Sequence, residues 1–515
     1  MTRRAGSTPP LALMGAAGVA AVLAAIPLLY IAVRTGSAGL EAVATVLARP
    51  RLPALLINTI ALVAGVTCAA TVLGVATAFI LARVRLRWTG ALAAVSMLPL
   101  AVPSYLAAFG WLAALPRIHG YAPSWLVLTV VTTPYVTLPV TAALRGMPPA
   151  FGEVARTLGY SPLQTFRSVT WPGIRNAALA GSLLVSLYAL ADFGGVALFR
   201  YPVLTTAIQQ AYGATFDRTY APVLSCLLVA IALGLLVLER RVRPRRGFAL
   251  GRDGAVDRIE AGRWTPALVA VVLLAPLSAV LVPLASLFSR LLSAQTVREL
   301  DVGRLASATA STVLLSVAGA AIALALALPI ATLGARYPGR AAQFAEIAGS
   351  LPLAIPGIVV GLGLVYFALR AAPALYQTAG LLAFAYGILF LPKAIGSTRS
   401  AIERVPDSLE DVAATLGYGR FARWRLVTLR LSRPGIAMAG IIVAVTAMKE
   451  LPATLMLRPT GLNTLALELW TTTDVAAYGA AVPYAVALVL VAAVPAVALA
   501  PREQRLSDPV PVRAR

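Results

Sequence analysis

The stretch EVARTLGYSPLQTFRSVTWP, residues 153–172, is a polar segment between two long apolar runs. A near copy, DVAATLGYGRFARWRLVTLR, occupies residues 411–430, 258 positions further along the chain. Both copies begin with an acidic residue and carry a glycine at the same spacing, Gly159 and Gly417. The pattern predicts a duplicated chain, in which each half carries one copy of the same polar module. The copies are called here the first module (153–172) and the second module (411–430).

The composition indicates a membrane protein with many spans. Of the 515 residues, 59% are hydrophobic and only 12% are charged, which is far from the balance of a soluble globular domain. About 20 consecutive apolar residues cross a bilayer as a helix. The sequence predicts about 12 such transmembrane helices, near 11–33, 54–82, 91–114, 123–144, 174–191, 220–238, 265–289, 308–335, 347–369, 374–395, 434–448 and 476–500. The expected fold class is an all-α polytopic membrane protein.

A long polar segment, residues 239–264, separates six spans from the next six. We therefore expect a first domain at 1–238, an Arg-rich linker at 239–264 and a second domain at 265–515. Arginines close to spans favour the cytoplasmic side. With the N-terminus also inside, the predicted cytoplasmic segments and the adjoining span ends hold 31 of the 43 Lys and Arg residues. This topology predicts cytoplasmic N- and C-termini, and it places both modules in the cytoplasm.

Several site chemistries are not expected. The formal charge of +23 comes from arginines dispersed among short loops, whereas nucleic-acid binding favours one basic face. The single histidine, His119, leaves no histidine cluster for a metal or a catalytic triad, and both cysteines lie in apolar runs. We expect no catalytic residue, no metal site and no nucleic-acid partner.

The two halves also match outside the modules. MLPLAVPSYLAAFGW from Met97 aligns with SLPLAIPGIVVGLGL from Ser350, at a shift of 253 positions. RYPVLTTAIQQAY from Arg200 aligns with RPTGLNTLALELW from Arg458, at the module's own shift of 258. Because each repeat has an even number of spans, the two six-helix repeats are expected to be parallel, related by an axis along the membrane normal.

Each module is predicted to form a helix, a glycine turn and a second helix. In the first module Gly159 suits the positive φ of a helix C-terminus. Ser161 and Gln164 have the spacing of a capping box, and Pro162 stands at the first helical position. In the second module Gly419 replaces the capping serine, so that helix is expected to begin less firmly. An interfacial amphipathic loop without a partner is the alternative.

The modules resemble the signature of the membrane permease subunits of binding-protein-dependent ABC importers. That signature is an acidic residue, two small residues, a glycine four further on and, after nine more residues, an isoleucine-x-leucine-proline ending. The first copy matches at Glu153, Ala155, Gly159, Val169 and Pro172, and the second at Asp411, Ala413, Gly417, Val427 and Leu429. The departures are Val154 and Val412 for alanine, Trp171 for leucine, Asp411 for glutamate and Arg430 for proline.

The resemblance implies that each module is a coupling-helix region, which sits in a cleft of a cytoplasmic ATPase subunit. The matching residues, Glu153, Ala155, Gly159, Pro172, Asp411, Ala413 and Gly417, are the expected ATPase-coupling positions. It also implies an extracytoplasmic substrate-binding protein as a partner and a place in the bacterial inner membrane, within the lipid bilayer. A fused chain of this kind looks like the iron(III)-type and thiamine-type permeases.

The ATP-hydrolysing machinery is expected in separate subunits. A phosphate-cradling loop needs Gly-x-x-x-x-Gly-Lys-Ser/Thr, and neither Lys393 nor Lys449, the only two lysines, follows such a pattern. Two modules therefore imply two copies of a partner ATPase, which uses ATP and Mg²⁺. The chain itself is expected to hold no cofactor and to be no enzyme.

Charged residues near the external mouth are the expected substrate pathway. The string ADFGG, with Asp192, Phe193 and Gly194, aligns with a string that contains Lys449 and Glu450. Ionisable groups near membrane depth are functional candidates by default. The alternative is solvation of helix ends, with a Lys449–Glu450 or an Asp192–Arg200 pair.

These strings are similar to those of iron(III) importer permeases, which favours ferric iron, alone or as a chelate, as the substrate. Thiamine, phosphonate and polyamine are the other substrates considered. A twelve-span secondary transporter driven by an ion gradient is the rival class, because it also has two parallel six-span repeats. Such a protein would need no paired cytoplasmic modules and would usually carry a titratable group in mid-span.

Overall fold

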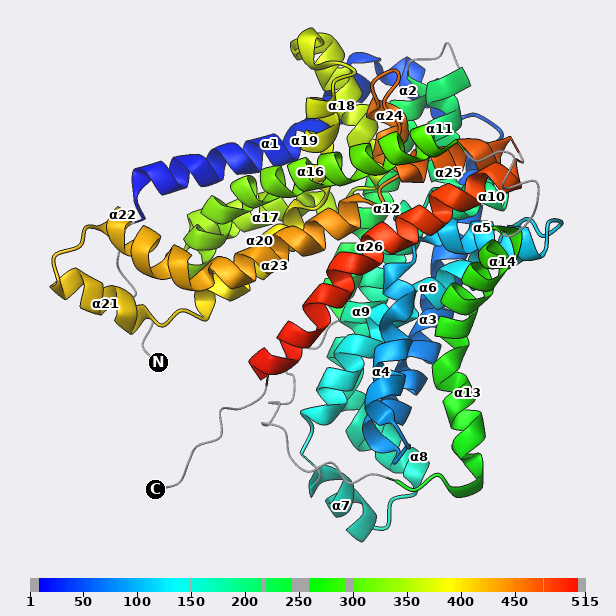
Figure 1. The fold of residues 1–515 in the computed structure, drawn as a ribbon, viewed down its shortest axis with the longest axis vertical. Helices are drawn as coiled ribbons and strands as arrows, with labels where there is room; N and C mark the ends of the chain where they lie inside the picture. The colour runs from blue at the N-terminus through cyan, green and yellow to red at the C-terminus, as the bar shows by residue number, and fades with distance from the viewer. Residues whose placement is uncertain are drawn as a thin grey trace. The chain divides into compact units, whose positions relative to one another are not determined.

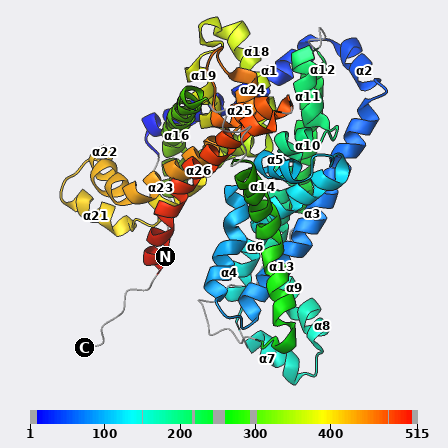
Figure 2. The same cartoon turned by 45° about the vertical axis from the view of Figure 1, so that its right-hand side comes forward.

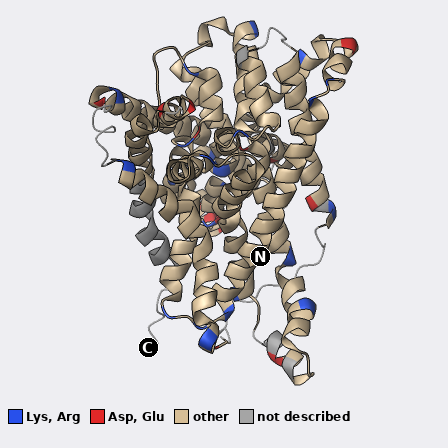
Figure 3. Ribbon diagram, turned by 90° about the vertical axis from the view of Figure 1, so that its right-hand side faces the viewer, with Lys and Arg blue, Asp and Glu red and all other residues tan. Residues whose placement is uncertain are grey.

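The computed structural model describes residues 9–148, 150–214, 219–242, 259–291, 301–475 and 477–507. Over these residues the chain is helical, and its only extended pairing is an isolated bridge between Val84 and Ile259. The predicted all-α fold class is confirmed. In Figure 3 the long helices are largely free of charge, and Lys and Arg gather near helix ends and connections.

Each of the twelve predicted spans overlaps an apolar helix or a bent pair of helices. Eight helices are long and apolar enough to cross a membrane, three further candidates are helix pairs bent by more than 40°, and Tyr478–Ala492 is a shorter apolar helix. Bending was not predicted. The bent pairs are Thr89–Ala101 with Ser104–Ala114, Arg340–Leu353 with Gly357–Ala371, and Ala379–Leu389 with Leu391–Glu403.

The chain forms two compact units, shown as ribbons in Figure 1. One unit comprises residues 40–298 and 473–482. Its helices are α2 (Leu40–Leu47), α3 (Leu52–Arg83), α4 (Thr89–Met97), η1 (Leu98–Ala101), α5 (Ser104–Ala114), α6 (Tyr121–Arg145), α7 (Ala150–Thr157), α8 (Pro162–Thr165), η2 (Phe166–Thr170), α9 (Trp171–Ala191), α10 (Gly194–Leu198), α11 (Leu204–Ala214), α12 (Tyr220–Val242), η3 (Gly262–Trp264), α13 (Thr265–Pro276), η4 (Leu277–Leu281) and α14 (Val282–Leu291). Helices α3, α6 and α9 pack together as its centre.

The other unit comprises residues 1–39, 299–472 and 483–515. Its helices are α1 (Leu11–Ser37), α16 (Val302–Arg336), α17 (Arg340–Ser350), η5 (Leu351–Ala354), α18 (Gly357–Ala371), η6 (Pro373–Leu375), α19 (Ala379–Leu389), α20 (Leu391–Glu403), α21 (Asp407–Thr415), α22 (Arg420–Arg423), η7 (Trp424–Thr428), α23 (Leu429–Ala447), α24 (Pro452–Leu457), α25 (Leu465–Asp474) and most of α26 (Tyr478–Ser507). Helices α16, α20 and α23 pack together as its centre, in positions equivalent to α3, α6 and α9.

The first helix of each repeat packs in the unit built mainly from the other repeat. Helix α1 contacts α16, α17 and α18, whereas α13 and α14 contact α3, α4, α5 and α6. The predicted domains at 1–238 and 265–515 were defined by the sequence repeat. As two repeated domains they stay a prediction. The compact units differ from them by this exchange of first helices.

Equivalent glycines make the two exchanged contacts possible. A Cβ atom on Gly363 of α18 would lie 2.4 Å from the Pro27 carbonyl oxygen of α1, and one on Gly110 of α5 would lie 2.3 Å from the Pro283 Cα of α14. Gly110 and Gly363 occupy the same position in the two repeats, 253 residues apart. Small residues let helix backbones approach closely, and such contacts drive helix association in membranes. Each exchanged helix is therefore held by backbone contact.

Proline breaks the third span of each repeat. Pro103 and Pro356 are extended, with ψ of 150° and 143°, and they separate α4–η1 from α5 and α17–η5 from α18. The resulting bends are 93° and 106°. Proline removes one backbone donor and clashes with the preceding turn. The predicted spans at 91–114 and 347–369 are therefore each broken into two helices, which was not predicted from the sequence.

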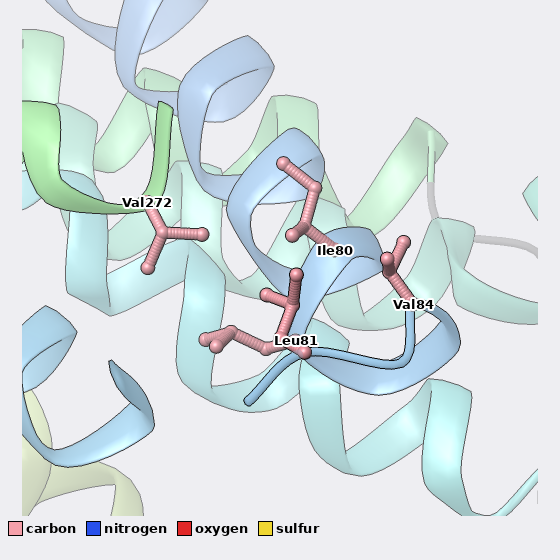
Figure 4. Close-up of a cluster of buried hydrophobic side chains, with 5 residues drawn as sticks. Ile80, Leu81, Val84 and Val272 are labelled. Atoms are coloured by element: carbon pink, nitrogen blue, oxygen red, sulfur yellow. The ribbon is translucent and has the colours of Figure 1, made fainter. Parts of the chain in front are cut away.

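The end of the linker is attached to the segment that follows α3. The Ile259 amide donates to the Arg83 carbonyl at 2.7 Å, and the Arg85 amide donates to the Ile259 carbonyl at 2.9 Å. A cluster of buried apolar side chains lies beside this bridge and joins α3 to α13 (Figure 4); it consists of Ile80, Leu81, Val84, Leu86 and Val272. This attachment directs α13 onto the first repeat. Residues 243–258 of the predicted linker lie outside the described residues.

The exchanged contact can be tested by adding one methyl group. Gly363→Ala should lower the thermal stability of the purified chain in detergent, because overpacking a close contact costs roughly 1–3 kcal/mol. Gly18→Ala, on α1 itself, is the matched control, since nothing lies within 4 Å of the position of its Cβ. Equal melting temperatures for the two variants would contradict the close contact between α1 and α18.

Candidate functional site

The first module folds as the sequence predicts, with α7, a turn, then α8 and η2. Gly159 forms the turn at φ 79°, and the Tyr160 amide donates to the Ala155 carbonyl at 3.0 Å. A side chain at this positive φ would be strained. Ala155 is buried, whereas Glu153 is exposed. Figure 2 shows α7 and α8 at one end of α9.

The predicted capping box is confirmed. The Gln164 amide donates to Ser161 Oγ at 3.3 Å, and the Ser161 amide donates to Gln164 Oε1 at 2.8 Å. Pro162 occupies the first helical position, where its missing N–H leaves no bond unmade. The second helix of the first module thus has a firm start that depends on local sequence.

The second module has the same shape but a different support. Gly417 forms its turn at φ 84°, and Gly419 begins α22 without any side-chain cap, as expected. Support comes instead from Glu410 on α21, which accepts a hydrogen bond from Thr428 Oγ1 and pairs with Arg336 Nε at 3.3 Å. Arg336 also pairs with Asp407.

Both modules end in one π-helical turn, at equivalent positions. The turns are η2 and η7, and they lead directly into α9 and α23. Pro172 is the second residue of α9, and its counterpart Arg430 is the second residue of α23. The departure from proline therefore leaves α23 intact. Single π turns inside helices frequently occur at functional sites.

Each module presents large apolar side chains that the described residues leave uncovered. In the first module Leu158 and Leu163 are 68% and 59% exposed, and in the second Leu416 and Phe421 are 71% and 70% exposed. Ala155 and its counterpart Ala413 are buried beneath them. Exposed apolar patches of this kind mark interaction sites. The geometry thus suits two equivalent docking surfaces.

At the end of α9 away from the first module, Asp192 directly follows the helix and faces the first turn of α5. Its carboxylate accepts a hydrogen bond from Ser104 Oγ and one from the Val196 amide at 3.2 Å. The Asp192 carbonyl accepts from Thr205 Oγ1 at 2.7 Å. The alternative interpretation expects an ion pair between Asp192 and Arg200. In the structure Asp192 is buried, and its carboxylate is bonded to Ser104 instead. Its contacts fix the break between α9 and α10.

Glu450 holds the equivalent break between α23 and α24. Its Oε1 accepts from the Ala453 amide at 3.1 Å, and its carbonyl accepts from Thr454 Oγ1 at 2.8 Å. A Cβ on Gly357, the first residue of α18, would lie 2.5 Å from Glu450 Oε1. Gly357 is the counterpart of Ser104. In the first repeat the shorter side chain of Asp192 meets a serine, and in the second the longer side chain of Glu450 meets a glycine.

Phe193 and Gly194 serve the same break. Phe193 is 2% exposed and precedes α10, of which Gly194 is the first residue. A Cβ on the next residue, Gly195, would lie 3.0 Å from Asp192 Oδ1. The glycines therefore admit the carboxylate close to the backbone, which is a structural role. A direct role of these residues in the pathway stays a prediction.

Lys393 is a residue that sequence reasoning missed. It lies two residues after the bend that separates α19 from α20, within a predicted span, and it is exposed in the protein. It interacts electrostatically with Glu450 and Lys449, and its ammonium lies 5.5 Å from the centre of the Phe390 ring. A titratable group therefore lies within the span predicted at 374–395. A lone lysine directly after Pro392 was the available signal.

The counterpart of Lys393 in the first repeat is Tyr135. The Tyr135 ring lies 5.8 Å, centre to centre, from the ring of Tyr188, which stands one helical turn before Asp192. In the second repeat Lys393 lies within electrostatic reach of Glu450. In the first repeat Tyr135 packs on Tyr188, close to Asp192 in the sequence. The two positions differ in charge.

The pairing of acid and small residue can be tested by exchange between the repeats. Gly357→Ser alone should destabilise the chain by roughly 1–3 kcal/mol, because it crowds Glu450, and Glu450→Asp alone should do so by roughly 1–3 kcal/mol, by losing the bond to Ala453. The double variant recreates the Asp192–Ser104 pair. Thermal unfolding in detergent should show it to be more stable than the sum of the single changes predicts. Strict additivity would refute the pairing.

Comparison with known proteins places this geometry in a family. The family model described as "binding-protein-dependent transport system inner membrane component" matches residues 70–241 and 323–508. Each matched segment contains one of the two modules.

Related proteins cover most of the chain. The Fe(3+)-transport system permease protein FbpB 2 of Haemophilus influenzae is 32% identical over 478 residues, which are 91% of this chain and 94% of that protein. The thiamine transport system permease protein ThiP of Escherichia coli is 26% identical over 66% of this chain and 67% of its own length. ThiP of Salmonella typhimurium is 27% identical over 74% of this chain and 76% of its own length. The chain belongs to the family of inner membrane permease components of binding-protein-dependent ABC importers, in its fused iron- and thiamine-type form.

Proposed function

We propose that the chain is the permease subunit of an importer that moves iron(III), alone or as a chelate, at the expense of ATP hydrolysed by separate subunits. The observation that carries the proposal is the pair of modules with exposed apolar surface, in a chain that aligns over 91% of its length with a permease named for Fe(3+) transport. A substrate-binding protein on the outer side delivers the iron.

The modules are the coupling sites of this proposal. Two copies of a cytoplasmic ABC ATPase bind the first and second modules, at Glu153, Ala155, Gly159 and Pro172 and at Asp411, Ala413 and Gly417. Both termini then lie in the cytoplasm, and the membrane is a bacterial inner membrane. ATP and Mg²⁺ are bound by the ATPase, because the chain has no lysine in a phosphate-binding loop.

Transport follows from alternating access. Closure of the two ATPases displaces the modules, and the π turns η2 and η7 pass that displacement directly into α9 and α23. The breaks held by Asp192 and Glu450 lie at the far ends of these helices. Movement of α9 and α23 therefore reaches the substrate side without an intervening loop.

Lys393 and Lys449 bear on the form of the substrate. Lys393 interacts electrostatically with the Glu450 carboxylate and with the Lys449 ammonium, within the same unit. Charged groups at membrane depth are retained where they serve a pathway or pair with one another. This charge set favours an iron complex with anionic ligands over bare Fe³⁺.

The substrate assignment can be tested in proteoliposomes that contain the chain and its ATPase, with the binding protein encoded beside it. Radioactive iron(III) should accumulate only when ATP is enclosed with the ATPase, and Lys393→Met should reduce uptake about tenfold or more, the range seen when a charged contact worth about 1.5–3 kcal/mol is lost. Arg370→Met, a substitution at a helix end, is the control. Accumulation of thiamine, a phosphonate or a polyamine instead would overturn iron. Uptake driven by an ion gradient without ATP would favour the secondary transporter.

The coupling assignment can be tested at the glycine turns. Gly159→Pro with Gly417→Pro should abolish ATPase binding and transport, because proline fixes φ near about −65°, whereas these positions have φ of 79° and 84°. Gly419→Ala is the matched control, since its φ is −65° and nothing lies within 4 Å of its Cβ position. Co-purification of the ATPase and ATP-dependent uptake are the measurements. Retention of both in the proline variant would contradict the proposal.

A further inference from the structure

The end of α16 is tied to the second module by an arginine that the known motif does not include. Arg336 is the last residue of α16, and its side chain is only 10% exposed. Its guanidinium pairs with Asp407, lies 3.3 Å from Glu410 Oε1 through Nε and donates to the Val405 carbonyl at 3.0 Å. One side chain thus contacts three groups of the segment that forms α21.

Glu410 extends this contact to a third element. The same oxygen that pairs with Arg336 also accepts a hydrogen bond from Thr428 Oγ1. Thr428 is fully buried and is the last residue of η7, directly before α23. The chain of contacts therefore runs from α16 through Arg336 to Glu410 on α21, and from there to the start of α23.

The first repeat lacks the acidic members of this set. Arg83 and Thr170 occupy the positions of Arg336 and Thr428, but Pro149 and Gly152 stand where Asp407 and Glu410 would be. Arg83 donates to the Leu144 carbonyl at 3.2 Å, which resembles the contact of Arg336 with Val405. The two repeats share an arginine that bonds to a carbonyl near the end of the fourth span, whereas the acids Asp407 and Glu410 are particular to the second repeat.

We propose that Arg336 is a positioning residue that fastens α21 to α16, so that displacement of the second module moves α16 and α23 together. A guanidinium suits this role because its planar array of donors can hold two carboxylates and a carbonyl at once. Low exposure of Arg336 limits the screening that weakens surface ion pairs. The two modules are thereby unequal: the first has a local capping box and a ring contact of Phe166 with Phe79 of α3, whereas the second is held to α16 by ion pairs.

This inference rests on the proposed coupling to an ATPase, so its test first requires ATP-dependent uptake by the unaltered complex. In proteoliposomes, Arg336→Gln should leave the ATPase bound and active while the amount of substrate transported per ATP falls at least about fivefold, the lower end of coupling between linked sites. Arg85→Gln is the matched control, because it removes a cytoplasmic ion pair with Glu260 whose side chains are 70% and 77% exposed. That variant should transport normally.

If Arg336→Gln folds poorly, Glu410→Gln provides a second variant for the same measurement of substrate transported per ATP. The amide keeps the shape of the side chain and removes its charge. The double variant should transport no less per ATP than the worse single variant, since both changes break one network. Unchanged transport per ATP in both single variants would overturn the inference. So would multiplicative losses in the double variant, or loss of ATPase binding in proportion to transport. Failure of the unaltered complex to use ATP would instead overturn the proposed function.

Discussion

A backbone N–H that is withdrawn from water must find an acceptor inside the protein, and this constraint governs the breaks that follow α9 and α23. Helices that break within a bilayer free such groups, and lipid cannot satisfy them. Asp192 and Glu450 each stand at a break and accept from the first turn of the next short helix, at Val196 and Ala453. An acidic residue there is thus required by the broken backbone before any contact with substrate is considered.

The duplicated architecture preserves geometry while its chemistry diverges. Asp192 faces Ser104, whereas Glu450 reaches over Gly357, so that a longer acid is matched by a smaller neighbour. Gly110 and Gly363 are the same residue in the same role, because backbone contact with Pro283 or Pro27 leaves no room for a side chain. At the exchanged helices the residue that touches backbone is glycine in both repeats, whereas at the acids the two partner residues differ together.

Local features of the modules could be predicted from sequence, because they depend on neighbours only a few residues away. The capping box of Ser161 and Gln164 and the positive φ of Gly159 and Gly417 are of this kind. The apolar runs located each span, but their bends were missed, since proline is also tolerated inside unbroken transmembrane helices. Pro27 and Pro329, for example, lie inside α1 and α16.

The exchange of first helices and the surroundings of Lys393 depend on tertiary contacts. Nothing near Gly363 in the sequence indicates that α1 would pack against it. Similarly, Lys393 and Glu450 are 57 residues apart in the sequence, and only the packing of α20 with α23 brings them within electrostatic reach. Pairings of this kind between distant segments are set by the whole fold, and a single sequence carries no local sign of them.

The contrast between the modules follows from how each can be made rigid. A cap such as that of Ser161 stabilises a helix end but connects it to nothing beyond its own turn. The ion pair of Glu410 with Arg336 and its hydrogen bond from Thr428 connect α21 to two long helices, at the cost of holding a largely buried arginine beside its acidic partners. Loss of one acceptor would leave that charge poorly compensated, which is more damaging than loss of a cap. The second module is therefore connected to α16 and α23 by charged and hydrogen-bonding side chains, whereas the first meets α3 through the rings of Phe166 and Phe79.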